Sequence, residues 1–106
     1  MIPRKSKADT ELIKKVFTEG SVYHFPLFSV RTLKSGVARY SIIVPSSVAP
    51  SAVKRVALKR KAYRALASVG PLQHTHTVVF ILKSAGKEES VQNIESSMRR
   101  VLESLN

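Results

Sequence analysis

The stretch KRVALKRKAYR, from Lys54 to Arg64, concentrates the residues of this chain that are most able to do chemistry. Six of its eleven residues are Lys or Arg, and none is acidic. Like charges repel at i,i+4 spacing on a helix, and no Asp or Glu within the stretch relieves them. A row of phosphate groups would neutralise them, because Arg gives two-pronged contacts and Lys gives single charges. The stretch therefore predicts a helix that binds nucleic acid through Lys54, Arg55, Lys59, Arg60, Lys61 and Arg64.

Charge over the whole chain favours the same interpretation. The 18 Lys and Arg residues against 7 Asp and Glu give a formal net charge of +11. No carboxylate side chain occurs from Ser21 to Lys87, whereas eleven basic residues do. A field of one sign is typical of polyanion binding. A solvated cationic face stays open as the alternative, and a membrane-surface helix is disfavoured because the cations are not set against large apolar residues such as Trp or Phe.

Catalysis by the protein's own side chains has little support in the sequence. Nucleases that use two metal ions need clustered carboxylates, and the chain has none between Glu19 and Glu88. The histidines are His24, His74 and His76. The last two alternate at a strand start and would offer two metal ligands without a third, and an acid–base pair with His24 has no sign of proximity. We therefore expect no catalytic residue and no metal site in the protein.

The elements that must position these residues fit one domain. A chain of 106 residues that is 43% hydrophobic can build a globular core, and we expect a single RNA-binding domain over 1–106. It contains no cysteine, which excludes disulfides and thiolate metal sites. No apolar run reaches the roughly 18 residues of a membrane span, and no signal-peptide pattern occurs. We expect a soluble, cytoplasmic protein.

The first half of the chain predicts a helix followed by strands. Apolar residues at i, i+1, i+4 and i+5 predict a helix over 9–19, which Gly20 would stop. Residues 22–33 are rich in aromatic and β-branched types, and Pro26 marks an edge, a bulge or a break between two short strands. Residues 37–44 predict another strand, which we expect to form an antiparallel hairpin with its predecessor.

The second half predicts a helix, a strand and a helix. Ser51 is a candidate N-cap for a helix over about 52–69, and one apolar stripe of this helix would face the sheet. Residues 76–82 form an apolar run typical of a strand covered on both faces, and 88–105 predict an amphipathic helix. The order α-β-β-β-α-β-α predicts an α+β fold, a small two-layer sandwich with helices on a mostly antiparallel sheet. The stripe consists of Leu58, Ala62, Leu66 and Val69.

The basic helix also carries a family resemblance. The sequence AVKRVALKRKAYRA resembles the signature helix of the bacterial ribonuclease P protein subunit, which typically reads Ala-Val-x-Arg-Asn-x-x-Lys-Arg. Upstream, IKKVFTEG resembles the first helix of that family, and the resemblance covers nearly the whole chain. The matching positions are Ala52, Val53, Arg55, Lys59 and Arg60 in the basic helix, and Phe17, Gly20, Phe28 and Arg39 before it.

Several positions depart from the family pattern. Val56 stands where the family has its Asn, and Tyr63 stands where an Arg is common. Ser46 and Ser47 replace a usual pair of lysines, so the loop before the basic helix is less basic than expected. Ile13 replaces a common Phe. The chain is therefore similar to the family as a divergent member.

The resemblance implies a protein subunit that has no catalytic residue of its own. Members of the family bind a large catalytic RNA and the 5′ leader of precursor tRNA. The ribonucleoprotein is an endoribonuclease that removes this leader by Mg²⁺-dependent hydrolysis of a phosphodiester bond, and the RNA holds the Mg²⁺ and carries the chemistry. For this chain the resemblance implies those two RNA partners, a ribosomal-protein-S5-domain-2-like fold, no cofactor bound by the protein alone, no membrane and no obligate protein partner.

A cleft for the leader, between the first helix and the sheet, is also implied by the resemblance. Aromatic faces in such a cleft stack on bases without reading their sequence. Phe17 matches a cleft position, although its place on an apolar stripe leaves a core role open. Arg31 stands where a cleft aromatic is usual, so a phosphate contact or a contact of its guanidinium plane would replace stacking. The implied cleft residues are Ile13, Phe17, Phe28 and Arg31.

Two other functions stay open on the sequence. A general, ribosomal-protein-like RNA-binding module without processing activity fits the fold and the charge equally well. A protein-only nuclease is disfavoured by the missing carboxylates. The register of the basic helix and the spacing of the first helix favour the ribonuclease P subunit.

Overall fold

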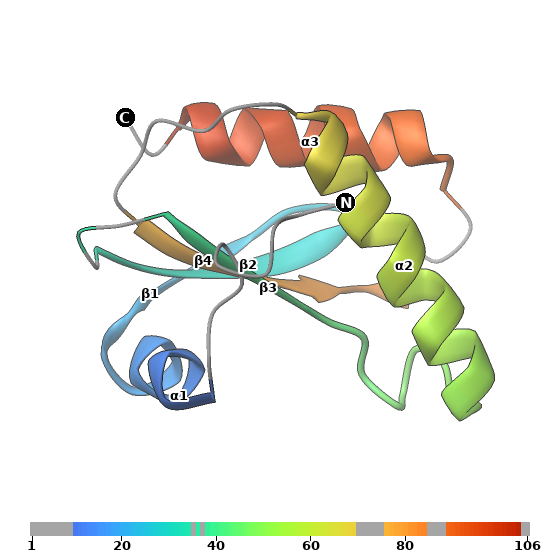
Figure 1. The fold of residues 1–106 in the computed structure, drawn as a ribbon, viewed down its shortest axis with the longest axis horizontal. Helices are drawn as coiled ribbons and strands as arrows, with labels where there is room; N and C mark the ends of the chain where they lie inside the picture. Colours follow the sequence, from blue (N-terminus) through green and yellow to red (C-terminus); the bar gives the residue numbers. More distant parts are fainter. Residues whose placement is uncertain (1–9, 35, 37, 70–75, 85–88, 105–106) are drawn as a thin grey trace.

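A computed structural model describes residues 10–34, 36, 38–69, 76–84 and 89–104 of the chain. The elements follow the predicted order α-β-β-β-α-β-α (Figure 1). None of the helices in these ranges is both long and apolar enough to cross a membrane. The elements are α1 (Thr10–Glu19), β1 (Ser21–His24), β2 (Phe28–Lys34), β3 (Arg39–Ile43), α2 (Ala52–Ser68), β4 (His76–Leu82) and α3 (Val91–Glu103).

Strand β4 lies inside the sheet, between β2 and β3. From Val78 to Leu82 its side chains are apolar on both faces, and Val78, Val79 and Phe80 are buried. A strand of this kind is stable where helices cover both faces of the sheet. β2 pairs with β4 antiparallel, β3 pairs with it parallel, and β1 continues the sheet as an edge strand beside β2.

The predicted hairpin between residues 22–33 and 37–44 is wrong. β2 and β3 follow each other along the chain, but β4 takes the position between them in the sheet. The sheet is therefore mixed, with one parallel and two antiparallel pairs. The break at Pro26 is confirmed, since β1 ends at His24 and β2 begins at Phe28.

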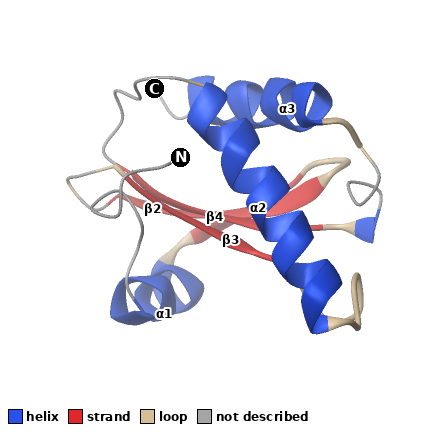
Figure 2. Ribbon diagram, turned by 45° about the vertical axis from the view of Figure 1, so that its right-hand side comes forward, coloured by secondary structure: helices blue, strands red, loops and turns tan. Residues whose placement is uncertain are grey.

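Helices cover the two faces of the sheet unequally. α2 and α3 pack against each other on one face, whereas the short α1 lies on the opposite face (Figures 1 and 2). Because α1 packs mainly against β2 and β4, Ile43 and Ile81 on its face of the sheet are only partly buried. The main core fills the space between the sheet and α2 and α3; it comprises Phe28, Val30, Tyr40, Ile42, Ala62, Ala65, Leu66, Val78, Phe80, Ile94, Met98, Val101 and Leu102.

The two long helices begin at serine caps. The Ser51 side chain accepts a hydrogen bond from the backbone N–H of Lys54 at 3.4 Å, as the sequence predicts. Ser90 caps α3 in the same way, and each bond satisfies one of the free donors at a helix start. α3 is shorter than the predicted helix over 88–105. The predicted helix stop at residues 70–71 lies outside the described residues, as do His74 and Leu105.

Gly20 joins α1 to β1 where the helix comes close to the sheet. It follows the last residue of α1 as predicted, although its φ is not left-handed; among the described residues Gly36 has the positive φ, at 85°. A Cβ at Gly20 would come within 2.5 Å of the carbonyl oxygens of Thr32 and Val16. Glycine is therefore needed here for space, and it lets α1 approach β2.

Gly20→Ala is expected to destabilise the fold by about 1–3 kcal/mol, because the added methyl group must push backbone away from backbone. Chemical denaturation measures the free energy of unfolding. Ser21→Ala, at the exposed neighbouring position, is the control and should change that free energy by less than about 0.5 kcal/mol. An unchanged stability of Gly20→Ala would contradict the close approach of α1 to β2.

Candidate nucleic-acid interface

The outer side of α2 is cationic, and none of its cations pairs with a described acid. Within the described part of the chain, the one ion pair lies on α3, so no carboxylate neutralises the charges of α2. Uncompensated like charges at helical spacing repel one another, and a polyanion would offset this repulsion. Lys54, Lys59, Arg60 and Arg64 are exposed, and Lys61 is half-buried.

Arg55 differs from the other cations of α2. Its Nη1 donates hydrogen bonds to the backbone carbonyls of Ala49 at 2.9 Å and of Pro50 at 2.7 Å. These bonds fasten the loop that precedes α2, and the side chain is half-buried. Arg55 therefore has a structural role, and the N–H groups that remain are the ones it can offer to a nucleic acid.

We use the word groove for the surface formed by Ile13, Phe17 and Arg31, where α1 packs against β2. Strand alternation directs Ser29 and Arg31 of β2 to the face on which α1 lies, where Val79 of β4 is the neighbour of Arg31. The Arg31 guanidinium lies over the Phe17 ring, 4.6 Å from the ring centroid. Phe17 is 39% exposed and is therefore not a core residue, and Ile13 lies half-buried one turn before it. The structure thus brings together three of the four predicted cleft residues.

Phe28, the fourth predicted cleft residue, does not line this groove. It is 1% exposed and belongs to the core beneath α2 and α3. Its ring meets Phe80 edge to face, with the ring centroids 5.2 Å apart. Because successive side chains of a strand alternate between faces, Phe28 and Arg31 lie on opposite sides of the sheet. The expectation for Phe28 is wrong.

The described histidines are far apart. His24 lies opposite Ser29 and His76 lies opposite Lys34, which are five residues apart on β2. This spacing corresponds to about 17 Å along the strand, and the two histidines lie on opposite faces of the sheet. An acid–base pair of His24 and His76 therefore does not form. Among the described residues, no three His, Asp or Glu side chains gather as metal ligands would.

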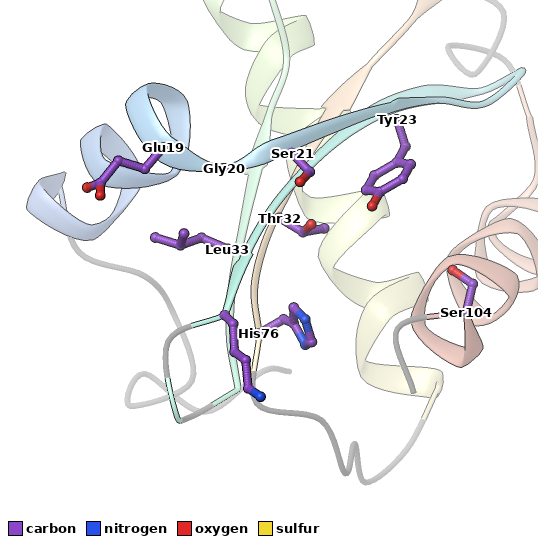
Figure 3. Close-up of a pocket in the computed structure, with 9 residues that line it drawn as sticks. Glu19, Gly20, Ser21, Tyr23, Thr32, Leu33, His76 and Ser104 are labelled. Carbon is purple, nitrogen blue, oxygen red and sulfur yellow. The ribbon is translucent and has the colours of Figure 1, made fainter.

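A hollow of about 300 Å³ lies at one end of the sheet, beside the last turn of α3. Figure 3 shows Tyr23, Thr32 and His76 around this hollow with Ser104, whereas Glu19 points away from it. Four of its nine lining residues carry hydroxyl groups, and Glu19 is the one carboxylate among them. This arrangement does not support metal-dependent hydrolysis, which needs clustered carboxylates.

Comparison with known proteins identifies the family. A family model described as ribonuclease P matches residues 5–106. The chain belongs to the ribonuclease P family. No curated protein sequence matches it significantly.

Solved structures of this family share the fold. The RNase P protein of Staphylococcus aureus is 18% identical, with a TM-score of 0.75 over 93% of this chain and 95% of that chain. The RNase P protein of Thermotoga maritima is 18% identical, with a TM-score of 0.76 over 94% of this chain and 97% of that chain. At this level of identity the likeness establishes the α+β fold alone.

Tyr63, which stands where the family commonly has Arg, joins α2 to the edge strand β3. Its hydroxyl accepts a hydrogen bond from the backbone N–H of Ile42 at 3.3 Å, and its ring packs against the main core. Backbone donors of an edge strand lack a second strand to bind them, so this bond supplies a partner. Tyr63 thus replaces a cation of the family pattern with a hydrogen bond that holds α2 on the sheet. The adjacent Arg64 is exposed.

Two valines interrupt the cationic surface of α2. Val53 is 79% exposed and Val56 is 49% exposed. They lie three residues apart, on the side of α2 away from the buried Ala62 and Leu66. Val56, which replaces the family's Asn, therefore faces solvent rather than the sheet.

Val56→Asn is expected to change the free energy of unfolding by less than about 0.5 kcal/mol, since an exposed side chain loses no packing. Val101→Asn in α3 is the matched control, because Val101 is 2% exposed. Burying an amide there should destabilise the protein by about 2 kcal/mol or more. Urea denaturation of the two variants measures both effects, and a comparable loss of stability in both would contradict the exposed position of Val56.

Proposed function

We propose that this protein is the protein subunit of ribonuclease P, which binds the catalytic RNA and the 5′ leader of precursor tRNA. The observation that carries the proposal is a helix whose six cations form no ion pair with any described acid, on a chain of the ribonuclease P family. The holoenzyme removes the leader by endonucleolytic hydrolysis. The protein supplies affinity and orientation, and its groups do not take part in bond cleavage.

The α2 cations bind the catalytic RNA as a charged surface. Contacts to phosphates position a protein on RNA without reading its sequence. Arg provides a fork of donors and Lys a single hydrated charge, so Arg60 and Arg64 matter most where two phosphate oxygens face the helix. Arg55 supports this surface indirectly, because it fixes the loop from which α2 begins.

The RNA subunit holds the Mg²⁺ ions and carries the hydrolysis. Two-metal hydrolysis requires several carboxylates within a few ångströms of one another, and the acids of this chain all lie in its terminal segments. The protein's cations reduce the repulsion between phosphate groups of the RNA. They neutralise phosphates that divalent ions would otherwise have to screen, so the holoenzyme needs less Mg²⁺ than the RNA alone.

The groove between α1 and the sheet receives the single-stranded leader. Ile13 and Phe17 provide apolar surface, and Arg31 provides charge. The same face of the sheet also carries Ile43 and Ile81, which are partly buried. A groove of this kind binds single strands with little sequence preference.

Replacing Lys59 and Arg60 together by Gln is expected to weaken binding to the catalytic RNA and to flatten its salt dependence. The slope of log affinity against log salt should fall by about 0.7–0.9 for each phosphate that the variant no longer neutralises. Stability should be unchanged or slightly higher, because like-charge repulsion decreases. A salt titration measures the slope, and the double Gln variant of Lys14 and Lys15, two exposed lysines of α1, is the charge-matched control. Equal slopes for wild type and the Lys59/Arg60 variant would mean that this face of α2 is only solvated.

Reconstitution tests the function itself. Precursor-tRNA cleavage is assayed at low Mg²⁺ with the protein alone, with a bacterial catalytic RNA alone, and with both. We expect cleavage only with both, and tighter binding of precursor than of mature tRNA. Cleavage by RNA-free protein would contradict the proposal, as would a protein that leaves the Mg²⁺ requirement of the RNA unchanged.

A further inference from the structure

We propose that Arg31 binds a phosphate group of the single-stranded leader, and that Phe17 positions the Arg31 guanidinium instead of stacking on a base. This inference rests on the proposed function and names the chemistry of one of its two sites. On this proposal the groove binds the sugar–phosphate backbone of the leader whatever its base sequence.

The stack of Arg31 on Phe17 joins two separate elements. Phe17 comes from α1, and Arg31 comes from the middle of β2, where Val22 of β1 and Val79 of β4 flank it. The guanidinium carbon lies 4.6 Å from the ring centroid, which is within the range of a cation–π contact. Both partners are anchored by secondary structure, so the guanidinium is held in place before any ligand arrives.

The donors of Arg31 are available. In the described part of the chain, no hydrogen bond and no ion pair joins its guanidinium to another residue. Other polar side chains on this face of the sheet are already hydrogen-bonded. Arg39 donates from Nη1 to the carbonyl of Ala38 at 3.0 Å, and the Nδ1 of His24 lies 3.3 Å from the Ser29 hydroxyl.

A half-buried cation without a counter-ion favours an anionic ligand. No carboxylate side chain occurs between Ser21 and Lys87 to supply one from within the sheet. A guanidinium stacked on a ring still presents its N–H groups along its edge, and this fork matches the oxygens of a phosphate group. Single-stranded RNA brings one phosphate with every nucleotide, so the leader supplies the missing anion.

A base is a poorer ligand for the same ring. The guanidinium already lies over the Phe17 ring. A base stacking on this side of the ring would displace Arg31 and lose the cation–π contact. Phe17 therefore acts through Arg31, as a positioning residue.

The experiment uses the holoenzyme reconstituted with a catalytic RNA and two series of precursor tRNAs. In one series a single leader phosphate is replaced by an uncharged methylphosphonate, and in the other a single leader nucleotide is abasic. Binding is measured with wild type, Arg31→Gln, Arg31→Lys and Phe17→Leu. Arg100→Gln, which removes one exposed cation from α3, is the control.

We expect one methylphosphonate position to weaken wild-type binding by about tenfold or more. A methylphosphonate at the same position should leave the affinity of Arg31→Gln unchanged. The slope of log affinity against log salt should be lower by about 0.7 in this variant. Arg31→Lys keeps the charge without the fork and should lie between the two. Phe17→Leu should lose the methylphosphonate effect as Arg31→Gln does, whereas Arg100→Gln should retain it.

An abasic position that weakens wild-type binding while no methylphosphonate does would overturn the inference, because a base would then stack in the groove. Unchanged leader affinity and salt slope in Arg31→Gln would also overturn it. Thermal unfolding shows whether each variant is folded. If Phe17→Leu is unstable, the binding measurements with Arg31→Gln alone test the inference. Failure of the proposed function is separate: the wild-type holoenzyme would then show no preference for precursor over mature tRNA.

Discussion

Strand β4 is apolar on both faces, and the rest of the fold is arranged to cover it. Val78 and Phe80 need a layer on one side, which α2 and α3 provide, and Val79 needs a layer on the other, where α1 lies. A sheet that was open on one face would leave Val79 in water. One short helix covers the part of this face nearest Val79, whereas Ile43 and Ile81 on the same face are only partly buried.

The acidic and basic residues are separated along the chain, because every acid lies in one of the two terminal segments. The strands of the sheet contain no acid, and in the part of the chain that the structure describes the cations of the sheet and α2 form no ion pair with a carboxylate. Some are used to fasten the chain, as Arg55 fastens the loop before α2. Others are left on the surface of α2 or, as with Arg31, against an aromatic ring. A protein that leaves its cations uncompensated has lower stability than it could have, and binding a polyanion recovers the difference.

Local patterns predicted the elements well and their neighbours poorly. Ser51, Pro26 and the buried stripe of α2 each follow from short-range rules. The order of strands in the sheet depends on how all the strands compare in their apolar surface, which no short stretch of sequence reveals. The expected hairpin between β2 and β3 was wrong because the more apolar β4 lies between them. The error at Phe28 was avoidable, because it lies three positions before Arg31 in one strand and an odd spacing places the two on opposite faces.

Other features of the site were beyond the reach of sequence patterns. The hydrogen bond between Tyr63 and Ile42 joins residues from separate elements, and no sequence pattern predicts it. The stack of Arg31 on Phe17 likewise depends on how closely α1 approaches β2, which Gly20 permits. The exposure of Val56 was within reach, since a helical wheel places it away from the buried stripe.

Lysine footprinting tests the central claim most directly, because it reports which surface the catalytic RNA covers. The protein is treated with an amine-reactive reagent with and without the RNA, and modified lysines are quantified by mass spectrometry. The RNA is predicted to protect Lys54 and Lys59 on α2, while the exposed Lys14 and Lys15 on α1 stay reactive. Unchanged reactivity of Lys54 and Lys59 in the presence of saturating RNA would contradict the account.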